Sequence, residues 1–102
     1  MDPAKQRRLE AAGWRVGTAA EFLKLSPEES AYVEMKFLLS RRLRDARLKE
    51  GLTQAELAER LGSSQSRVAK MEAGDRSVSI DLLLRALLQM GLSPRQIARV
   101  IG

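Results

Sequence analysis

The chain contains no cysteine and no histidine among its 102 residues. Without cysteine there are no disulfides or thiolate zinc sites, and without either residue there are no Cys–His or Ser–His nucleophile pairs. Histidine is also the side chain best suited to proton transfer near pH 7. The acid pairs Glu28/Glu29 and Glu56/Glu59 stand where helix starts and solvated helix faces place acids anyway. We therefore predict a protein that is not an enzyme and holds no metal and no cofactor.

Long apolar runs are also missing. The first residues, MDPAKQRRLEAAGW, lack the apolar stretch of a signal peptide, and no run approaches the roughly 18 apolar residues of a membrane span. We therefore expect a cytoplasmic protein without a membrane partner. What the chain does have is basic charge, with 18 Lys and Arg against 13 Asp and Glu. The formal net charge of +5 favours an anionic partner such as nucleic acid, an acidic protein surface or anionic lipid.

Helix boundaries are marked along most of the chain. Ser26-Pro27, Thr53 with Glu56, and Ser93-Pro94 are helix-start patterns. Glycines follow helix-forming stretches and accept the positive φ found just past a helix end; they are Gly51, Gly62, Gly74 and Gly91. No stretch alternates apolar and polar residues over the length of a strand. The sequence predicts an all-α fold, with helices near residues 4–12, 18–25, 27–49, 53–61, 64–73, 79–90 and 94–101.

The long helix near residues 27–49 is predicted to connect two parts of the chain. We expect residues 1–34 to form an N-terminal helical extension that leads into this helix, and residues 35–102 to form one domain. Within the helix, an apolar stripe predicted to face a core comprises Met35, Leu39, Leu43 and Ala46. Basic residues lie elsewhere on its surface.

Residues 53–74, TQAELAERLGSSQSRVAKMEAG, read as two short helices joined by a tight turn. Ala58 is small enough for the helices to approach closely, and Gly62 can adopt the left-handed conformation of the turn. The outward face of the second helix is polar and free of acid, and comprises Gln65, Ser66, Ala69 and Lys70. This face suits the major groove of duplex DNA, where Gln pairs with adenine. An ordinary solvated helix surface is the alternative.

Further residues around this face have groups that bind phosphate. Ser63 and Ser64 stand at the start of the second helix, where hydroxyls and free backbone N–H groups can meet phosphate oxygens. Lys70 or Arg67 can reach bases or backbone. Arg76, in the short loop that follows, is a candidate for a backbone phosphate, with a solvated turn as the alternative.

Residues 38–92 resemble the XRE-type helix-turn-helix family of phage Cro proteins and repressors. The shared residues are Arg47, Gly51-Leu52-Thr53-Gln54, Glu56-Leu57-Ala58, Leu61-Gly62, Val68, Glu72 and Gly74. The resemblance implies a five-helix, lambda-repressor-like domain and a sequence-specific repressor of transcription. It also implies that Gln54 holds a phosphate and that Ser64, Gln65, Ser66 and Lys70 face the groove. An Arg47–Glu72 salt bridge is implied as well, which makes Arg47 structural.

The aromatic residues are few and lie away from this segment. Trp14, Phe22, Tyr32 and Phe37 all precede residue 38, so the DNA-facing helix has no stacking platform of the kind that single-strand binders use. Double-stranded DNA is therefore favoured over RNA or single strands.

The helix near residues 79–90 is apolar on more than one face, which one small core cannot cover. We expect it to form a homodimer interface that includes Leu84 and Leu88, since repressors of this kind read twofold operators as dimers. The alternative is that the N-terminal helices cover this face.

The N-terminal pattern resembles a second group of proteins. Gly13-Trp14-Arg15-Val16-Gly17-Thr18, Glu21-Phe22-Leu23 and Ser26-Pro27-Glu28-Glu29 are similar to segments of HigA-like bacterial antitoxins. This resemblance implies a RelE-like toxin as a protein partner and repression of the protein's own operon. Trp14, beside Arg15, is a candidate contact because large aromatics next to Arg are common at protein interfaces; the alternative is that Trp14 packs the first two helices onto the long one. A helical module that binds an acidic protein without reading DNA is the alternative function.

Overall fold

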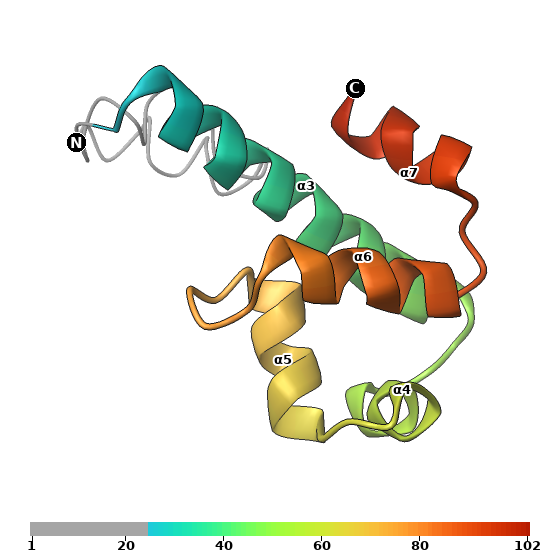
Figure 1. Cartoon of the computed structure of the whole chain (residues 1–102). Coiled ribbons are helices and arrows are strands. Elements are labelled where there is room, and N and C mark those ends of the chain that lie inside the picture. Colours follow the sequence, from blue (N-terminus) through green and yellow to red (C-terminus); the bar gives the residue numbers. More distant parts are fainter. Residues whose placement is uncertain (1–24) are drawn as a thin grey trace, which may run out of the picture. The chain divides into compact units, whose positions relative to one another are not determined.

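The computed structural model describes residues 25–102. The helix expected near residues 4–12, almost all of the helix expected near residues 18–25, and the side chains of Trp14 and Phe22 lie outside the described residues. Residues 25–102 contain helices and no strand, which confirms the predicted all-α class. The helices are α3 (Pro27–Lys49), α4 (Gln54–Leu61), α5 (Gln65–Ala73), α6 (Ile80–Gln89) and α7 (Pro94–Ile101) (Figure 1). Their bounds agree with the predicted ones to within one residue.

Side-chain caps at the N-termini explain why the helices begin where they do. At α4, the Thr53 hydroxyl accepts a hydrogen bond from the Glu56 backbone N–H, and the Glu56 carboxylate accepts one from the Thr53 backbone N–H. Ser93 and Gln96 form the same reciprocal arrangement at α7. The Ser64 and Ser79 hydroxyls cap α5 and α6. These bonds satisfy backbone donors that would otherwise have no partner in the first turn.

Two glycines place α5 against its neighbours. Gly62 ends α4 with φ 69°, and the Ser63 N–H then bonds to the Ala58 carbonyl at 2.8 Å, which turns the chain sharply into α5. Gly74 ends α5 with φ 67°, and a Cβ at this position would lie 3.3 Å from the hydroxyl oxygen of Ser40 on α3. Ser40 is buried and donates a hydrogen bond to the Lys36 carbonyl at 2.8 Å. The end of α5 therefore packs closely on α3, and the contact between Gly74 and Ser40 was not predicted from the sequence.

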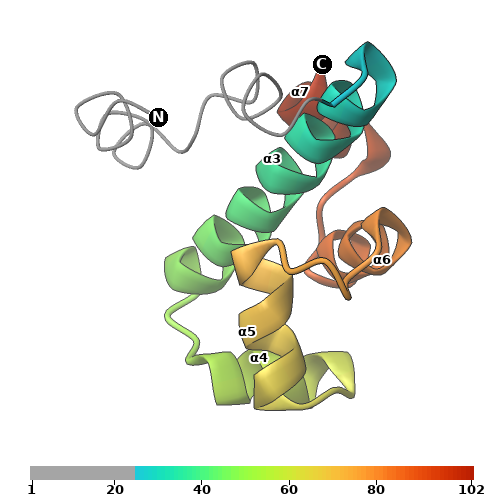
Figure 2. The same ribbon diagram turned by 90° about the vertical axis from the view of Figure 1, so that its left-hand side faces the viewer.

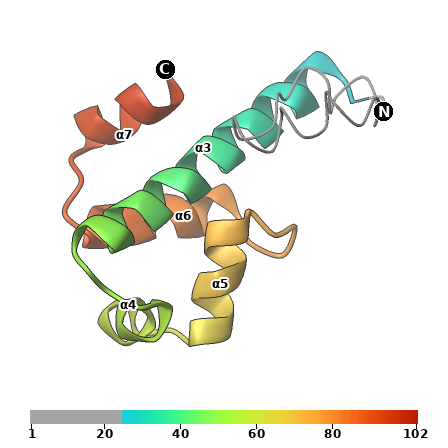
Figure 3. The ribbon, with the colours of Figure 1, turned by 180° about the vertical axis from the view of Figure 1, so that it is seen from behind.

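Residues Met35–Gly102 form one compact unit around a single apolar core. Figures 2 and 3 show α6 beside the C-terminal half of α3, with α4 and α5 crossing below them. The predicted stripe on α3 is buried at Leu39, Leu43 and Ala46, whereas Met35 is only half-buried. The other helices contribute fully buried side chains, namely Leu57, Val68, Met71, Leu83 and Leu87. Burial of these apolar groups is the main force that holds the short helices together.

An ion pair connects α3 to α5 inside this unit. The Arg47 Nε donates to Glu72 Oε2 at 2.6 Å and the Arg47 Nη2 donates to Glu72 Oε1 at 3.0 Å, which is a bidentate arrangement. The Arg47 Nη1 donates to the Leu52 carbonyl at 2.8 Å. The hydrogen bond with Glu72 raises the pKa of Arg47 above its ordinary value. The two side chains are only 11% and 5% exposed, so this pair is part of the interior.

Glu72→Ala should therefore lower the free energy of unfolding by about 3–5 kcal/mol, because it leaves the Arg47 cation buried without its partner. Urea unfolding of the parent protein and of the Glu72→Ala variant at 25 °C measures this difference. Asp81→Ala is the control: it removes an acid from the Asp81–Arg85 pair, whose side chains are 71% and 73% exposed, and exposed pairs contribute about 1 kcal/mol or less. Equal losses in the two variants would contradict the structural role given to the Arg47–Glu72 pair.

Candidate nucleic-acid interface

The exposed surface of α5 carries the residues that the sequence assigned to the major groove. Gln65, Ser66 and Lys70 are exposed and Ala69 is half-buried. Val68 and Met71, on the opposite side of the helix, are buried in the core. The structure therefore brings the four groove-facing candidates to the open side of α5, while α4 packs against the other side.

Glu72 is the only acidic residue of α5, and it does not contribute negative charge to that open side. Its carboxylate is buried and bonded to Arg47, as described above. Arg67 and Lys70 are both exposed on the same helix. The accessible side chains of α5 are therefore neutral or positive, as a surface that approaches phosphates requires.

Gln54 is tied into the Arg47–Glu72 pair, which the sequence did not indicate. It is the first residue of α4, is half-buried, and donates from Nε2 to Glu72 Oε1 at 3.2 Å. A primary amide has two N–H donors, so one remains for another acceptor. The side chain that the resemblance assigned to a phosphate is therefore oriented by the residue that closes α5.

The two serines at the turn differ in what they can offer. The Ser64 hydroxyl is the N-cap of α5 and accepts from the Arg67 N–H at 3.2 Å. The Ser63 hydroxyl oxygen is buried and has no hydrogen-bond partner among the described residues, and its N–H is already bonded to Ala58. That Ser63 binds a phosphate stays a prediction, and its hydroxyl lies on the buried side of the turn after Gly62.

The loop between α5 and α6 is held by Asp75. Its carboxylate accepts from the Ser77 N–H at 2.9 Å and from the Ser77 hydroxyl at 2.6 Å. These hydrogen bonds, with a smaller contribution from the charges of Lys70 and Lys36, lower the pKa of Asp75 below its ordinary value. Arg76 is exposed in this loop. It therefore stands beside the end of α5, on a short segment fixed by its own hydrogen bonds.

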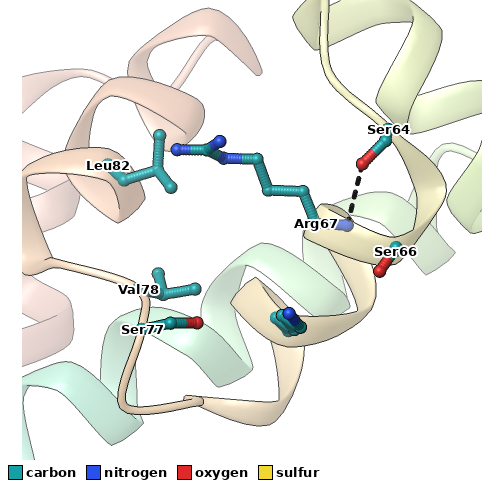
Figure 4. A pocket seen from close by; sticks show the side chains of 7 residues that line it. Ser64, Ser66, Arg67, Ser77, Val78 and Leu82 are labelled. Carbon is teal, nitrogen blue, oxygen red and sulfur yellow. Dashed lines mark hydrogen bonds between the residues drawn. The ribbon is translucent and has the colours of Figure 1, made fainter.

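A pocket of about 300 Å³ lies between α5, this loop and α6 (Figure 4). Its lining comprises Ser64, Ser66, Arg67, Lys70, Ser77, Val78 and Leu82. The first four were assigned to DNA from the sequence, and the last three were not. Leu82 belongs to a helix in which every turn carries leucines, so no local signal distinguishes it from a core residue.

The two leucines assigned to a self-interface occupy different environments on α6. Leu88 is 48% exposed, whereas Leu84 is partly buried and packs against the core. Leu88 is thus the accessible member of the pair. Leu48, on α3, is exposed to a similar extent, at 53%.

Comparison with known families assigns the domain. A family model described as helix-turn-helix matches residues 43–97, which is just over half of the chain and includes α4 and α5. The chain belongs to this family, in its XRE-type form, and is a DNA-binding transcriptional regulator. No curated protein and no solved structure gives a significant match to the chain.

Residues 25–102 offer neither a membrane span nor a cluster of metal ligands. No helix in residues 25–102 is both long and apolar enough to cross a membrane. In the same part of the chain, no group of three or more acidic residues could hold a metal ion.

Ser63→Ala and Ser64→Ala form a matched test of the turn. Ser63→Ala removes a buried hydroxyl that has no partner, so the free energy of unfolding should stay the same or rise by up to about 1 kcal/mol. Ser64→Ala removes the N-cap of α5 and should lower it by about 1 kcal/mol. Urea unfolding measures both. A larger loss for Ser63→Ala than for Ser64→Ala would show that the Ser63 hydroxyl is hydrogen-bonded.

Proposed function

We propose that the protein is a repressor that reads a specific sequence of duplex DNA through the exposed side of α5. The observation that carries this proposal is the acid-free surface of α5, from which the Arg47–Glu72 pair removes the helix's one carboxylate. Membership of the helix-turn-helix family supports DNA binding, and the side chains on the surface support sequence reading.

Base recognition is assigned to the open side of α5. Gln65 can bond to both N6 and N7 of an adenine, and Ser66 and Lys70 can donate to acceptors on neighbouring bases. Ala69 has no polar group and can contact only a thymine methyl. Because Gln65 stands in the first turn of α5, it is on the part of the helix that enters deepest in this class of protein.

Backbone contacts are assigned to residues around this surface. Gln54 offers its free amide N–H, and the exposed cations Arg67 and Arg76 lie on α5 and in the following loop. Ser64 stands where the first N–H groups of α5 are open to an anion. Such contacts set the register of the protein on DNA without specifying bases.

The repressor is proposed to act as a homodimer. Leu88 places a large apolar side chain on the surface of α6, a helix that is apolar on more than one face, where a second copy of the chain could cover it. Two copies related by a twofold axis would present two α5 helices to half-sites about one helical turn apart.

The narrower part of the proposal is that this repressor is an antitoxin that controls its own operon. It is supported by the sequence pattern of residues 13–29, most of which lie outside the described part. A RelE-like toxin, encoded next to the protein, would be the second partner. Rescue of growth when the adjacent open reading frame is expressed with this protein tests that role.

The function is tested by selecting duplexes from a random library with the full chain and by footprinting the DNA upstream of its own gene. A repressor of this kind should enrich one sequence, with twofold symmetry if it binds as a dimer, and protect a matching site upstream. Binding that depends on salt but enriches no sequence would overturn the proposal.

Gln65→Ala should weaken binding to the selected duplex by about 1–3 kcal/mol, which is roughly 5- to 150-fold. It should also relax the preference at one base pair, because the bidentate contact is lost there. Fluorescence anisotropy with duplex variants measures both effects. Gln89→Ala, on the exposed surface of α6, is the control and should bind like the parent. An equal loss of affinity on every sequence would rule out base reading by Gln65.

Leu88→Lys should give a folded monomer that binds the selected duplex more weakly, because one half-site supplies fewer contacts. Leu88 is the better position to test than Leu84, whose partial burial makes a lysine there disruptive. Leu48→Lys introduces the same charge at a similarly exposed leucine and should leave the dimer intact. Sedimentation of the parent as a monomer, with and without the duplex, would exclude the dimer.

A further inference from the structure

The pocket between α5 and α6 has a composition that base reading does not explain. Base edges are met by the open side of α5, whereas this pocket also uses Ser77 and Val78 from the loop and Leu82 from α6. Three structural segments therefore contribute to one small site.

The lining of the pocket is positively charged. It contains Arg67 and Lys70 and no acidic residue. The ion pairs of residues 25–102 are Arg47–Glu72, Arg60–Glu50 and Arg85–Asp81, so within that part of the chain neither Arg67 nor Lys70 is in an ion pair. The nearest acid of the loop, Asp75, is already bonded to the N–H and hydroxyl of Ser77. Arg67 is thus available to an anion, whereas the charge of Lys70 already interacts with that of Asp75.

The pocket has a polar side and an apolar side. Figure 4 shows the Arg67 side chain extending from α5 toward Leu82, while Val78 lines the pocket beside Ser77. The Ser66 hydroxyl and the planar guanidinium of Arg67 are donors that match the oxygens of a phosphate, whereas the Ser77 hydroxyl already donates its one hydrogen to Asp75. Val78 is itself buried in the core, at 3% exposed, and Leu82 is half-buried, so Leu82 is the apolar side chain of the lining that a ligand can still cover. A ligand that fits both sides carries an anion on a compact carbon skeleton.

We infer that this pocket binds one phosphate group attached to a sugar or a similarly compact carbon skeleton. Its volume of about 300 Å³ is at the lower end of ligand pockets, which suits a single nucleotide unit. The phosphate can come from the backbone of the bound duplex or from a free phosphorylated compound. The first source rests on the proposed function, and the second does not. A free compound would also compete with DNA, because Ser66 and Lys70 belong both to the pocket and to the open side of α5.

The first experiment uses thymidine 5′-monophosphate as the probe, with thymidine as the matched compound that lacks the phosphate. Amide chemical shifts of the full chain should change at residues 64–70 and 77–82 with the monophosphate and not with thymidine. Arg67→Gln should weaken binding by about fivefold or more, because a charge-assisted contact is lost. Arg95→Gln, which removes the same charge from the exposed surface of α7, should have little effect.

The second experiment tests the backbone as the source. Single methylphosphonate substitutions, each of which neutralises one phosphate, are scanned along the selected duplex. At one position the substitution should weaken binding of the parent by about fivefold or more and have no further effect on Arg67→Gln, because both changes remove the same contact.

The two experiments separate the possible outcomes. Coupling of Arg67 to one backbone phosphate identifies the duplex as the source, and displacement of the duplex by the monophosphate identifies a free compound. If Arg95→Gln weakens binding of the monophosphate as much as Arg67→Gln does, and no backbone position couples to Arg67, the inference is wrong. If no duplex is enriched by selection, the proposed function fails, while the monophosphate titration still decides whether the pocket binds phosphate.

Discussion

The bidentate pair between Arg47 and Glu72 is the interaction on which both the fold and the acid-free surface of α5 depend. A buried ion pair contributes little net stability when its desolvation is counted, but losing one partner is costly. Here the remaining polar atoms are also bonded, with Arg47 donating to the Leu52 carbonyl and Gln54 donating to Glu72. One pair thus fixes α3, the start of α4 and the end of α5, and it keeps the acid of α5 away from the open surface.

Close packing at both ends of α5 also fixes the position of this helix. Gly62 lets the chain turn directly from α4 into α5, and Gly74 allows the end of α5 to meet Ser40 on α3. A side chain at either glycine would have to adopt a backbone conformation that L-residues rarely take. Because both ends of α5 are held by backbone and buried contacts, its exposed side chains are left free to differ without changing the helix position.

Local signals made the helices predictable, but they did not make the contacts between helices predictable. Thr53 with Glu56 and Ser93 with Pro94 mark helix starts within four residues of sequence, so the bounds could be read directly. The buried hydroxyl of Ser63, the tie from Gln54 to Glu72 and the place of Leu82 in a pocket depend on residues distant along the chain. The Arg47–Glu72 contact, 25 residues apart, was expected only because a family resemblance carries tertiary information.

The position of the pocket beside the open side of α5 connects affinity to specificity. Backbone contacts hold a DNA-binding protein in register, and base contacts discriminate only within that register. Lys70 and Ser66 border both the pocket and the open side of α5, so under the proposed function a phosphate held between α5 and α6 would set the depth at which Gln65 enters the groove. Leu82 and Val78 line the pocket from α6 and the loop, elements to which no base contact is assigned. On the proposed function, residues remote from the bases would determine how precisely Gln65 selects an adenine.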